Sequence, residues 1–167
     1  MAFTAAGVLF TDGINVLAGF QPGKNAISGF GGSREGRETI RQTAFREAVE
    51  ELLEPALLPT QLIQSLVDRY KAHPVTRKGT YRFLTLSFED LLILLQEATA
   101  ADLKSQIYTT IPTTMAALIR KRKPLPSTEV SRLTIVSVHE PTFEGLDPYF
   151  AADLQTLSSY DYDYGSV

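Results

Sequence analysis

Apolar positions recur along the 167 residues in strand-like and helix-like patterns. Two apolar, β-branched stretches, residues 3–10 and 14–20, are separated by Asp12-Gly13, a dipeptide that favours the positive φ angles of a tight turn. We therefore expect these two stretches to pair as a β-hairpin. Residues 26–30 are expected to add a short strand that ends at Gly31-Gly32.

The clearest helical pattern runs from Thr39 to about Leu53. Thr39 and Gln42 have the spacing of a capping box, and Pro55 prevents the helix from continuing. Between these limits, apolar residues recur so as to form one broad face. Its members are Ile40, Ala44, Phe45, Ala48, Val49 and Leu52.

The remaining segments predict a mixture of both element types. Residues 61–71 fit a strand or a helix, whereas residues 79–88 read as a strand with Tyr81, Phe83 and Thr85 on one face. Residues 89–123 turn helical and predict a helical insert or lid, and residues 132–138 predict another strand. A short helix follows, and the polar tail of residues 158–167 is expected to be mobile. This order favours an α+β fold or an α/β/α sandwich.

Composition narrows the protein class. The 44% hydrophobic content suits a single domain over residues 1–167, and a net charge of −3 gives no global sign of a nucleic-acid or membrane-surface binder. No apolar run reaches the roughly 18 residues of a membrane span, so a cytoplasmic protein is expected. The chain has no cysteine and two histidines, so any metal must be held by oxygen ligands.

Four glutamates gather near the end of the predicted helix. At 100° per residue, Glu47, Glu50, Glu51 and Glu54 fall within one narrow arc. Like charges at i,i+4 cost roughly 0.2–0.5 kcal/mol per pair, and the negative end of the helix dipole adds to this cost. A divalent cation such as Mg²⁺ or Mn²⁺ would remove the repulsion, since hard cations bind carboxylate oxygens. A solvated acidic face is the alternative.

The residues around these glutamates form a longer motif. Gly32 is followed after five residues by Glu38, and after seven more by Arg46-Glu47-Ala48-Val49-Glu50-Glu51. This spacing resembles the Nudix box of the Nudix hydrolases, GX5EX7REUXEEXGU, in which U is a bulky apolar residue. Leu53 and Glu54 depart from it, because they stand where the family has a glycine and an apolar residue, and Ala48 is small for the first apolar position.

The resemblance implies an α/β/α sandwich with a mixed sheet and Mg²⁺- or Mn²⁺-dependent hydrolysis of a nucleoside diphosphate linked to another group. Glu47, Glu50 and Glu51 would be metal ligands, together with the backbone carbonyl of Gly31 or Gly32. Glu50 or Glu51 would also polarise water, while Glu38 and Arg46 would orient the loop and the glutamates. The family often takes a base from outside the box. Glu129, six residues ahead of Ile135, is the first candidate, and the alternatives are Glu89, Asp90 and Glu140.

The substrate is less constrained. Lys24 and Arg34 are candidates for phosphate contacts, and Phe30 and Tyr81 are the leading candidates for stacking on a base, with Phe20, Phe83 and Tyr149 as alternatives. Partners would be a nucleotide or a nucleotide-linked molecule.

The basic run Arg120-Lys121-Arg122-Lys123 is either a solvated helix end or a grip on RNA or a highly phosphorylated inositol. The second reading makes an mRNA-decapping or diphosphoinositol polyphosphate hydrolase the runner-up. A binding module without turnover is the alternative of another class. The protein would be a monomer or a homodimer, and the apolar residues 91–95 would serve a dimer interface or lie within the subunit.

Overall fold

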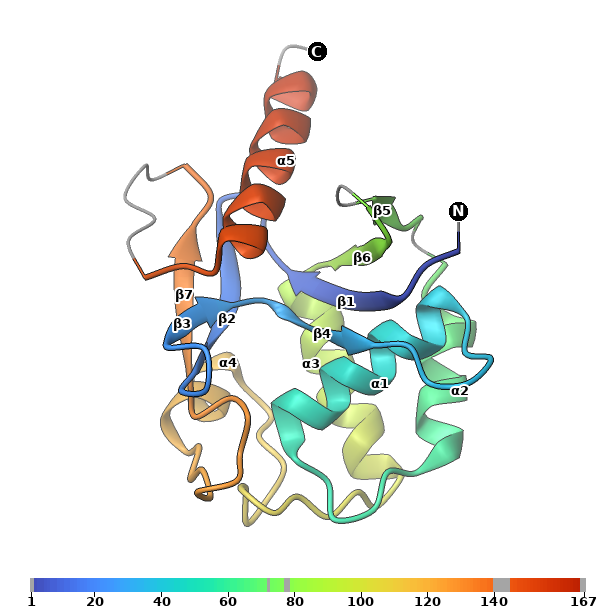
Figure 1. Ribbon diagram of the computed structural model, residues 1–167. Helices are drawn as coiled ribbons and strands as arrows, with labels where there is room; N and C mark the ends of the chain where they lie inside the picture. The colour runs from blue at the N-terminus through green and yellow to red at the C-terminus, as the bar shows by residue number, and fades with distance from the viewer. Residues whose placement is uncertain (1, 72, 77–78, 140–144, 166–167) are drawn as a thin grey trace.

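The computed structural model describes residues 2–71, 73–76, 79–139 and 145–165 and contains two β-sheets flanked by helices (Figure 1). The first sheet has the order β4-β1-β6-β5 and the second β3-β2-β7. The strands are β1 Ala5–Phe10, β2 Asn15–Gln21, β3 Ala26–Ser28, β4 Phe30–Ser33, β5 Val75–Thr76, β6 Tyr81–Leu86 and β7 Arg132–Ser137. The helices are α1 Ile40–Leu53, α2 Thr60–Arg69, α3 Phe88–Ala100, α4 Met115–Arg120 and α5 Pro148–Gly165.

The predicted hairpin is wrong in its pairing, although its turn is correct. Gly13 has φ 94°, and the Asp12 carboxylate accepts hydrogen bonds from the backbone N–H groups of Ile14 and Asn15 at 2.9 and 2.7 Å. However, β1 pairs with β4 on one side and in parallel with β6 on the other, so β2 joins the other sheet. Between β1 and β2 only an isolated bridge, from Thr11 to Val16, is found in the described residues.

The predicted third strand is divided between the two sheets. Residues 26–28 form β3 beside β2, and residues 30–33 form β4 beside β1. Gly29 is the point of transfer, where a Cβ atom would lie 2.9 Å from Leu9 Cδ2. The absence of a side chain at Gly29 therefore lets the chain pass close to β1 as it moves from one sheet to the other.

Helices cover both sides of the strands, as expected for an α/β/α sandwich. The larger hydrophobic cluster joins α1, α2 and α3 to β1 and to Leu84 and Leu86 of β6. The smaller cluster joins Phe83 of β6 to β2 and to Phe150 and Leu154 of α5. The predicted alternation of β6 is thus confirmed, because alternate side chains pack into different clusters. In Figure 1, α5 extends away from the rest of the fold.

The segment predicted as a helical insert contains α3 and α4. Leu91, Leu94 and Leu95 of α3 are buried in the larger cluster and Leu92 packs against it, so most of the apolar residues 91–95 pack within the subunit. The ambiguous segment 61–71 is helical as α2. None of the described helices combines the length and apolar character that a membrane crossing needs.

The C-terminal region is more regular than predicted. α5 runs to Gly165, so most of the segment expected to be a mobile tail is helical, and residues 166 and 167 lie outside the described residues. Its mobility stays a prediction.

Candidate active site around the glutamates of α1

Both ends of α1 are fixed by local hydrogen bonds. The Thr39 hydroxyl accepts from the Gln42 backbone N–H at 3.2 Å, and the Gln42 side chain accepts from the Thr39 N–H at 2.8 Å, as the capping-box spacing predicted. At the other end, Glu54 adopts a left-handed conformation with φ 43°. Leu53, at the position of the expected box glycine, is the last helical residue and is buried. Leu53 therefore causes no strain, because the left-handed conformation falls on the next residue.

Arg46 connects α1 to the loop that follows β4. Its guanidinium group binds both carboxylate oxygens of Glu38, from Nε at 2.6 Å and from Nη2 at 3.0 Å, and Nη2 also donates to the Ser33 carbonyl at 2.8 Å. Glu38 in turn accepts from the Glu35 N–H and the Thr43 hydroxyl. Burial raises the pKa of Glu38, but the hydrogen bonds from Arg46, Glu35 and Thr43 outweigh it and leave the pKa lowered. Glu38 is therefore held as a carboxylate that orients this loop.

The same guanidinium group also orients two of the clustered glutamates. Arg46 Nη1 donates to Glu47 Oε1 at 2.9 Å and to Glu50 Oε2 at 3.2 Å. The hydrogen bond to Glu38 is the largest cause of the raised pKa of Arg46. Gly32 leaves room for the carboxyl group of Glu47, since a Cβ atom at Gly32 would lie 2.4 Å from Glu47 Cδ. A side chain at this position would therefore displace the carboxyl group of a candidate ligand from the place it occupies here.

Glu51 is the most buried of the four glutamates, with 3% of its surface exposed. Its Oε1 accepts the Gly31 N–H at 2.8 Å, whereas its Oε2 is buried and has no hydrogen-bond partner in the structure. Burial raises its pKa well above the usual value, and the negative charges of Glu129 and Glu47 raise it further. Burial also raises the pKa values of Glu47 and Glu50. These carboxyl groups are therefore destabilised as anions when no cation is bound.

Glu129 lies with these glutamates although it is far from them in sequence. It borders a pocket of about 340 Å³ together with Glu50, Glu51 and Glu54, and residues 55–58 also line this pocket. Its charge raises the pKa values of both Glu47 and Glu51. Of the other candidate bases, Asp90 belongs to the capping box of α3, in which its carboxylate accepts a hydrogen bond from the Ser87 N–H. Glu89 is exposed in the first turn of that helix. Glu140 lies outside the described residues.

The donor set at this site fits a hard divalent cation. The available groups are carboxylates, one of them with a buried oxygen that lacks a partner, and hard cations bind such oxygens. Within the described part of the chain, no three acidic or histidine side chains are already arranged as a metal site. Glu47 and Glu50 accept hydrogen bonds from Arg46, and Glu51 accepts one from the Gly31 N–H.

The candidate substrate-binding residues differ in their positions. Phe30 is 1% exposed and packs against Phe10 with ring centroids 6.3 Å apart, so the expectation that it stacks on a base is wrong. It is in the core because β4 directs it toward the helices. Tyr81 is partly buried, and its hydroxyl lies close to the backbone of Gly7 and Gly31.

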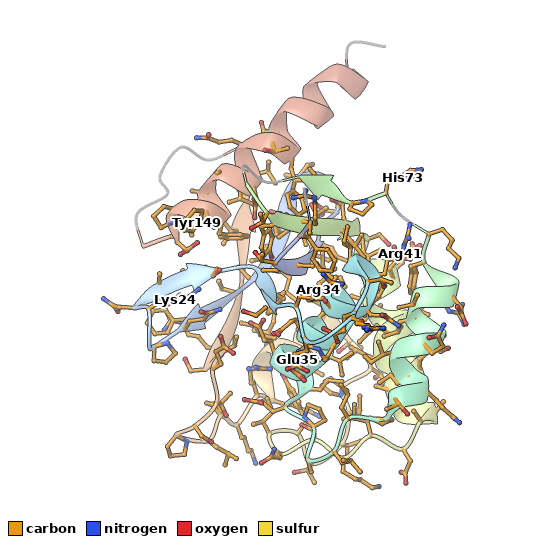
Figure 2. The ribbon with its side chains drawn as sticks, turned by 45° about the vertical axis from the view of Figure 1, so that its right-hand side comes forward. Lys24, Arg34, Glu35, Arg41, His73 and Tyr149 are labelled. Carbon is orange, nitrogen blue, oxygen red and sulfur yellow. The ribbon has the colours of Figure 1, made fainter. Side chains whose placement is uncertain are left out.

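The two candidate phosphate contacts are both exposed. Arg34 donates to the Glu38 carbonyl at 2.8 Å and lies over the Phe3 ring at 4.8 Å. Lys24 is in the turn between β2 and β3, and its charge lowers the pKa of Glu51. Figure 2 shows Arg34 and Glu35 on one loop, with Lys24 on a separate turn.

One residue of this region was not found from the sequence. Arg122 is 8% exposed and donates to the carbonyl groups of Glu51 and Leu52, each at 2.6 Å, and to the Val130 carbonyl at 2.9 Å. Both readings of the basic run as four solvent-facing cations are therefore wrong for Arg122. Nothing in the sequence distinguished Arg122 from the other cations of the run, although its neighbours Lys121 and Lys123 are exposed.

Comparisons with known proteins support the fold. Two solved structures of a bifunctional NMN adenylyltransferase/ADP ribose pyrophosphatase from Francisella tularensis, one of them complexed with AMP and a Mn ion, match 96% of this chain at 14% identity. Their TM-scores are 0.50 for the complex and 0.53 for the other structure, and the chain spans 42% of that protein's length.

A Nudix hydrolase from M. smegmatis, RenU, is matched at 17% identity over 96% of this chain and 86% of that one, with a TM-score of 0.45. No family model and no curated protein matches the chain. The mixed α+β fold thus rests on the structure itself and on its likeness to the F. tularensis protein.

Proposed function

We propose that this protein is a Nudix-type pyrophosphohydrolase that uses Mg²⁺ or Mn²⁺ to cleave a pyrophosphate linkage in a nucleoside diphosphate derivative. One observation carries the proposal. Glu51 is buried with an oxygen lacking a partner, and the charges of Glu47 and Glu129 act on it. Such a cluster destabilises the folded protein unless a cation neutralises it, so a role in binding accounts for a feature that folding alone does not.

Glu47, Glu50 and Glu51 would hold the cation, with the carbonyl of Gly31 or Gly32 as a further oxygen ligand. When bound, it would neutralise pyrophosphate charge and lower the pKa of the attacking water. Arg46 supports this arrangement, because its bonds to Glu38, Glu47 and Glu50 fix the loop and two of the ligands together. The same cation would remove the repulsion that raises the pKa of Glu51.

Glu129 is the proposed general base. It borders the same pocket as Glu50 and Glu51, so it can receive a proton from a water molecule there. The water oxygen would form a bond to phosphorus while the bond from phosphorus to the bridging oxygen breaks, and the phosphate-containing leaving group would depart with the electron pair of that bond. No covalent intermediate with the enzyme is required. Leu57 and Leu58 also line this pocket and would offer apolar contacts to the non-phosphate part of a substrate.

The test is hydrolysis of a substrate panel in the presence of Mg²⁺ or Mn²⁺. The panel contains nucleoside triphosphates, dinucleoside polyphosphates, nucleotide sugars, capped RNA and diphosphoinositol phosphates. We expect turnover of a nucleotide substrate, and we expect Glu51→Gln and Glu129→Gln each to reduce kcat by about 100-fold or more. Asp68→Asn on the exposed face of α2 serves as the control and should leave kcat unchanged.

The other outcomes distinguish the alternatives. Preferred cleavage of capped RNA would favour a decapping enzyme, and preferred cleavage of a diphosphoinositol phosphate would favour that class of hydrolase. Tight binding of one panel member without any product would favour a binding module. Equal activity in Glu51→Gln and in the unmodified protein would contradict the proposed site.

A further inference from the structure

A second pocket lies beside Tyr108, whose hydroxyl accepts a hydrogen bond from Arg122. It has a volume of about 520 Å³, and its walls are residues 108–113, which follow α3, and the segment from Ala117 to Lys123 that includes the end of α4. Its charges come from Arg120, Lys121 and Lys123, and none of the described residues that line it is acidic. Its charge is therefore opposite to that of the pocket beside Glu51.

Hydrogen bonds join the two walls of this pocket. The Lys123 N–H donates to the Ile107 carbonyl at 3.2 Å. Arg122 Nη1 donates to the Tyr108 hydroxyl at 3.1 Å, and that hydroxyl donates to the Leu118 carbonyl. Tyr108 itself is buried, and its backbone N–H is bonded to the Ser105 hydroxyl at 3.0 Å. The walls are therefore fixed before a ligand arrives, which reduces the entropy lost on binding.

Arg122 differs from its neighbours in the basic run. Because its side chain is directed inward to the carbonyl groups of Glu51, Leu52 and Val130, it contributes no charge to the pocket. Lys121 and Lys123 on either side of it are exposed and line the pocket with Arg120. Thr109, Thr110 and Thr113 add hydroxyl groups to the opposite wall. A cavity lined by three cations and three hydroxyl-bearing residues suits an anion with several phosphate oxygens.

We propose that this pocket binds a small polyphosphorylated ligand, independently of the hydrolase site. The size favours a small molecule over a nucleic acid, since ligand pockets commonly enclose about 300–1,000 Å³. Binding here would not require a divalent cation, because the pocket supplies its own positive charge. This property separates it from the glutamate site, whose carboxylates repel phosphate when no cation is present.

The experiment is calorimetric titration of the full chain with inorganic tripolyphosphate in EDTA. We expect saturable binding at one site that weakens as ionic strength rises. Lys121→Gln/Lys123→Gln should weaken the affinity at least tenfold, whereas Arg37→Gln/Lys71→Gln, which removes two exposed cations near the start of α1, should change it less than twofold. Glu51→Gln should also retain the binding, so failure of the hydrolase proposal would not affect this result.

A second measurement locates the ligand. Amide NMR shifts induced by tripolyphosphate are expected at Thr109, Thr110, Lys121 and Lys123. Absence of binding in EDTA would overturn the proposal, as would equal loss of affinity in both double variants. Tighter binding of a single-stranded RNA oligonucleotide through the same lysines would overturn the assignment to a small ligand.

Discussion

At the scale of single residues, Glu51 shows how the fold and the proposed chemistry oppose each other. Its carboxyl group is almost completely buried near Glu47 and Glu129, and within the described residues the Gly31 N–H is the one group that donates a hydrogen bond to it. Burial of a charge without compensation is costly, so the group retains its proton to a higher pH than an exposed glutamate. The folded protein therefore binds this proton more tightly than the unfolded chain does.

This difference gives a pH-dependent stability with a defined sign. Because the pKa of Glu51 is higher in the folded state, its contribution is most favourable below its unfolded pKa and is lost as the pH rises through its folded pKa. In EDTA, Glu51→Gln should therefore have a higher Tm than the unmodified protein at pH 8, and the difference should shrink toward pH 4. Thermal unfolding between pH 4 and pH 8 checks this. A difference in Tm that does not change with pH would contradict the assignment to Glu51.

A second residue-scale prediction concerns Leu53 and Glu54, the two positions that depart from the end of the Nudix box. Glycine adopts the left-handed conformation without the steric cost that a glutamate incurs, so Glu54→Gly should raise the free energy of unfolding by about 0.5–1 kcal/mol. Leu53→Gly would restore the glycine of the motif but should lower it by at least about 3 kcal/mol, since Leu53 is helical and buried. Urea denaturation of both variants measures this. Stabilisation by Leu53→Gly would show that the helix ends one residue earlier.

At the scale of elements, the C-terminal end of α1 is held by segments far away in sequence. The Glu51 and Leu52 carbonyl groups accept from Arg122, the Leu53 carbonyl accepts from the Ser105 hydroxyl, and the Glu54 carbonyl accepts from the Gln106 N–H at 2.8 Å. The last carbonyl groups of a helix have no partner within the helix, so these bonds replace missing ones. In Figure 1, the loops that follow α1, α3 and α4 meet at this end of the fold.

Arg122 is the central residue of this arrangement, and its removal should affect both stability and catalysis. Arg122→Met leaves buried carbonyl groups without partners, so we expect the free energy of unfolding to fall by about 2–4 kcal/mol. The variant also loses the hydrogen bonds to the carbonyl group of Val130, which is adjacent to Glu129. We therefore expect kcat to change by a larger factor than KM. Urea denaturation and steady-state kinetics measure these effects. Lys123→Met, at the exposed neighbouring position, is the control and should change stability by less than about 0.5 kcal/mol.

The helices and strands of this fold could be predicted better than the pairing of the strands and the contacts between elements. The capping box and Pro55 determined α1 because helix signals are local. The structure brings Glu38, Arg46 and Glu47 together, whereas their role in a site stays a prediction. The pairing of β1 could not be predicted from the Asp12-Gly13 turn, since strand partners are chosen by long-range packing. Arg122 could not be told from its exposed neighbours, because the carbonyl groups that bind it belong to other elements.

At the scale of the whole molecule, the fold separates opposite charges. The chain has a net charge of −3, but one pocket is bordered by four glutamates and another by three cations. The buried Arg122 donates hydrogen bonds to a lining residue of each, the Glu51 carbonyl and the Tyr108 hydroxyl. The glutamate pocket combines residues of α1, residues 55–58 and residue 129, which are brought together only in the folded state. A cation bound by these residues would therefore favour the folded state over the unfolded chain.

Mg²⁺ should consequently stabilise the entire domain and not only the site. For a ligand that binds only the folded state, a free concentration of 100 Kd adds about 2.7 kcal/mol, which corresponds to a rise in Tm of about 5–11 °C for a domain of this size. Differential scanning calorimetry with and without Mg²⁺ measures the rise. Glu50→Gln and Glu51→Gln should each reduce it, because each removes a proposed ligand, whereas Asp68→Asn should retain it. An equal rise in all four proteins would mean that Mg²⁺ acts elsewhere and that the buried glutamates serve another purpose.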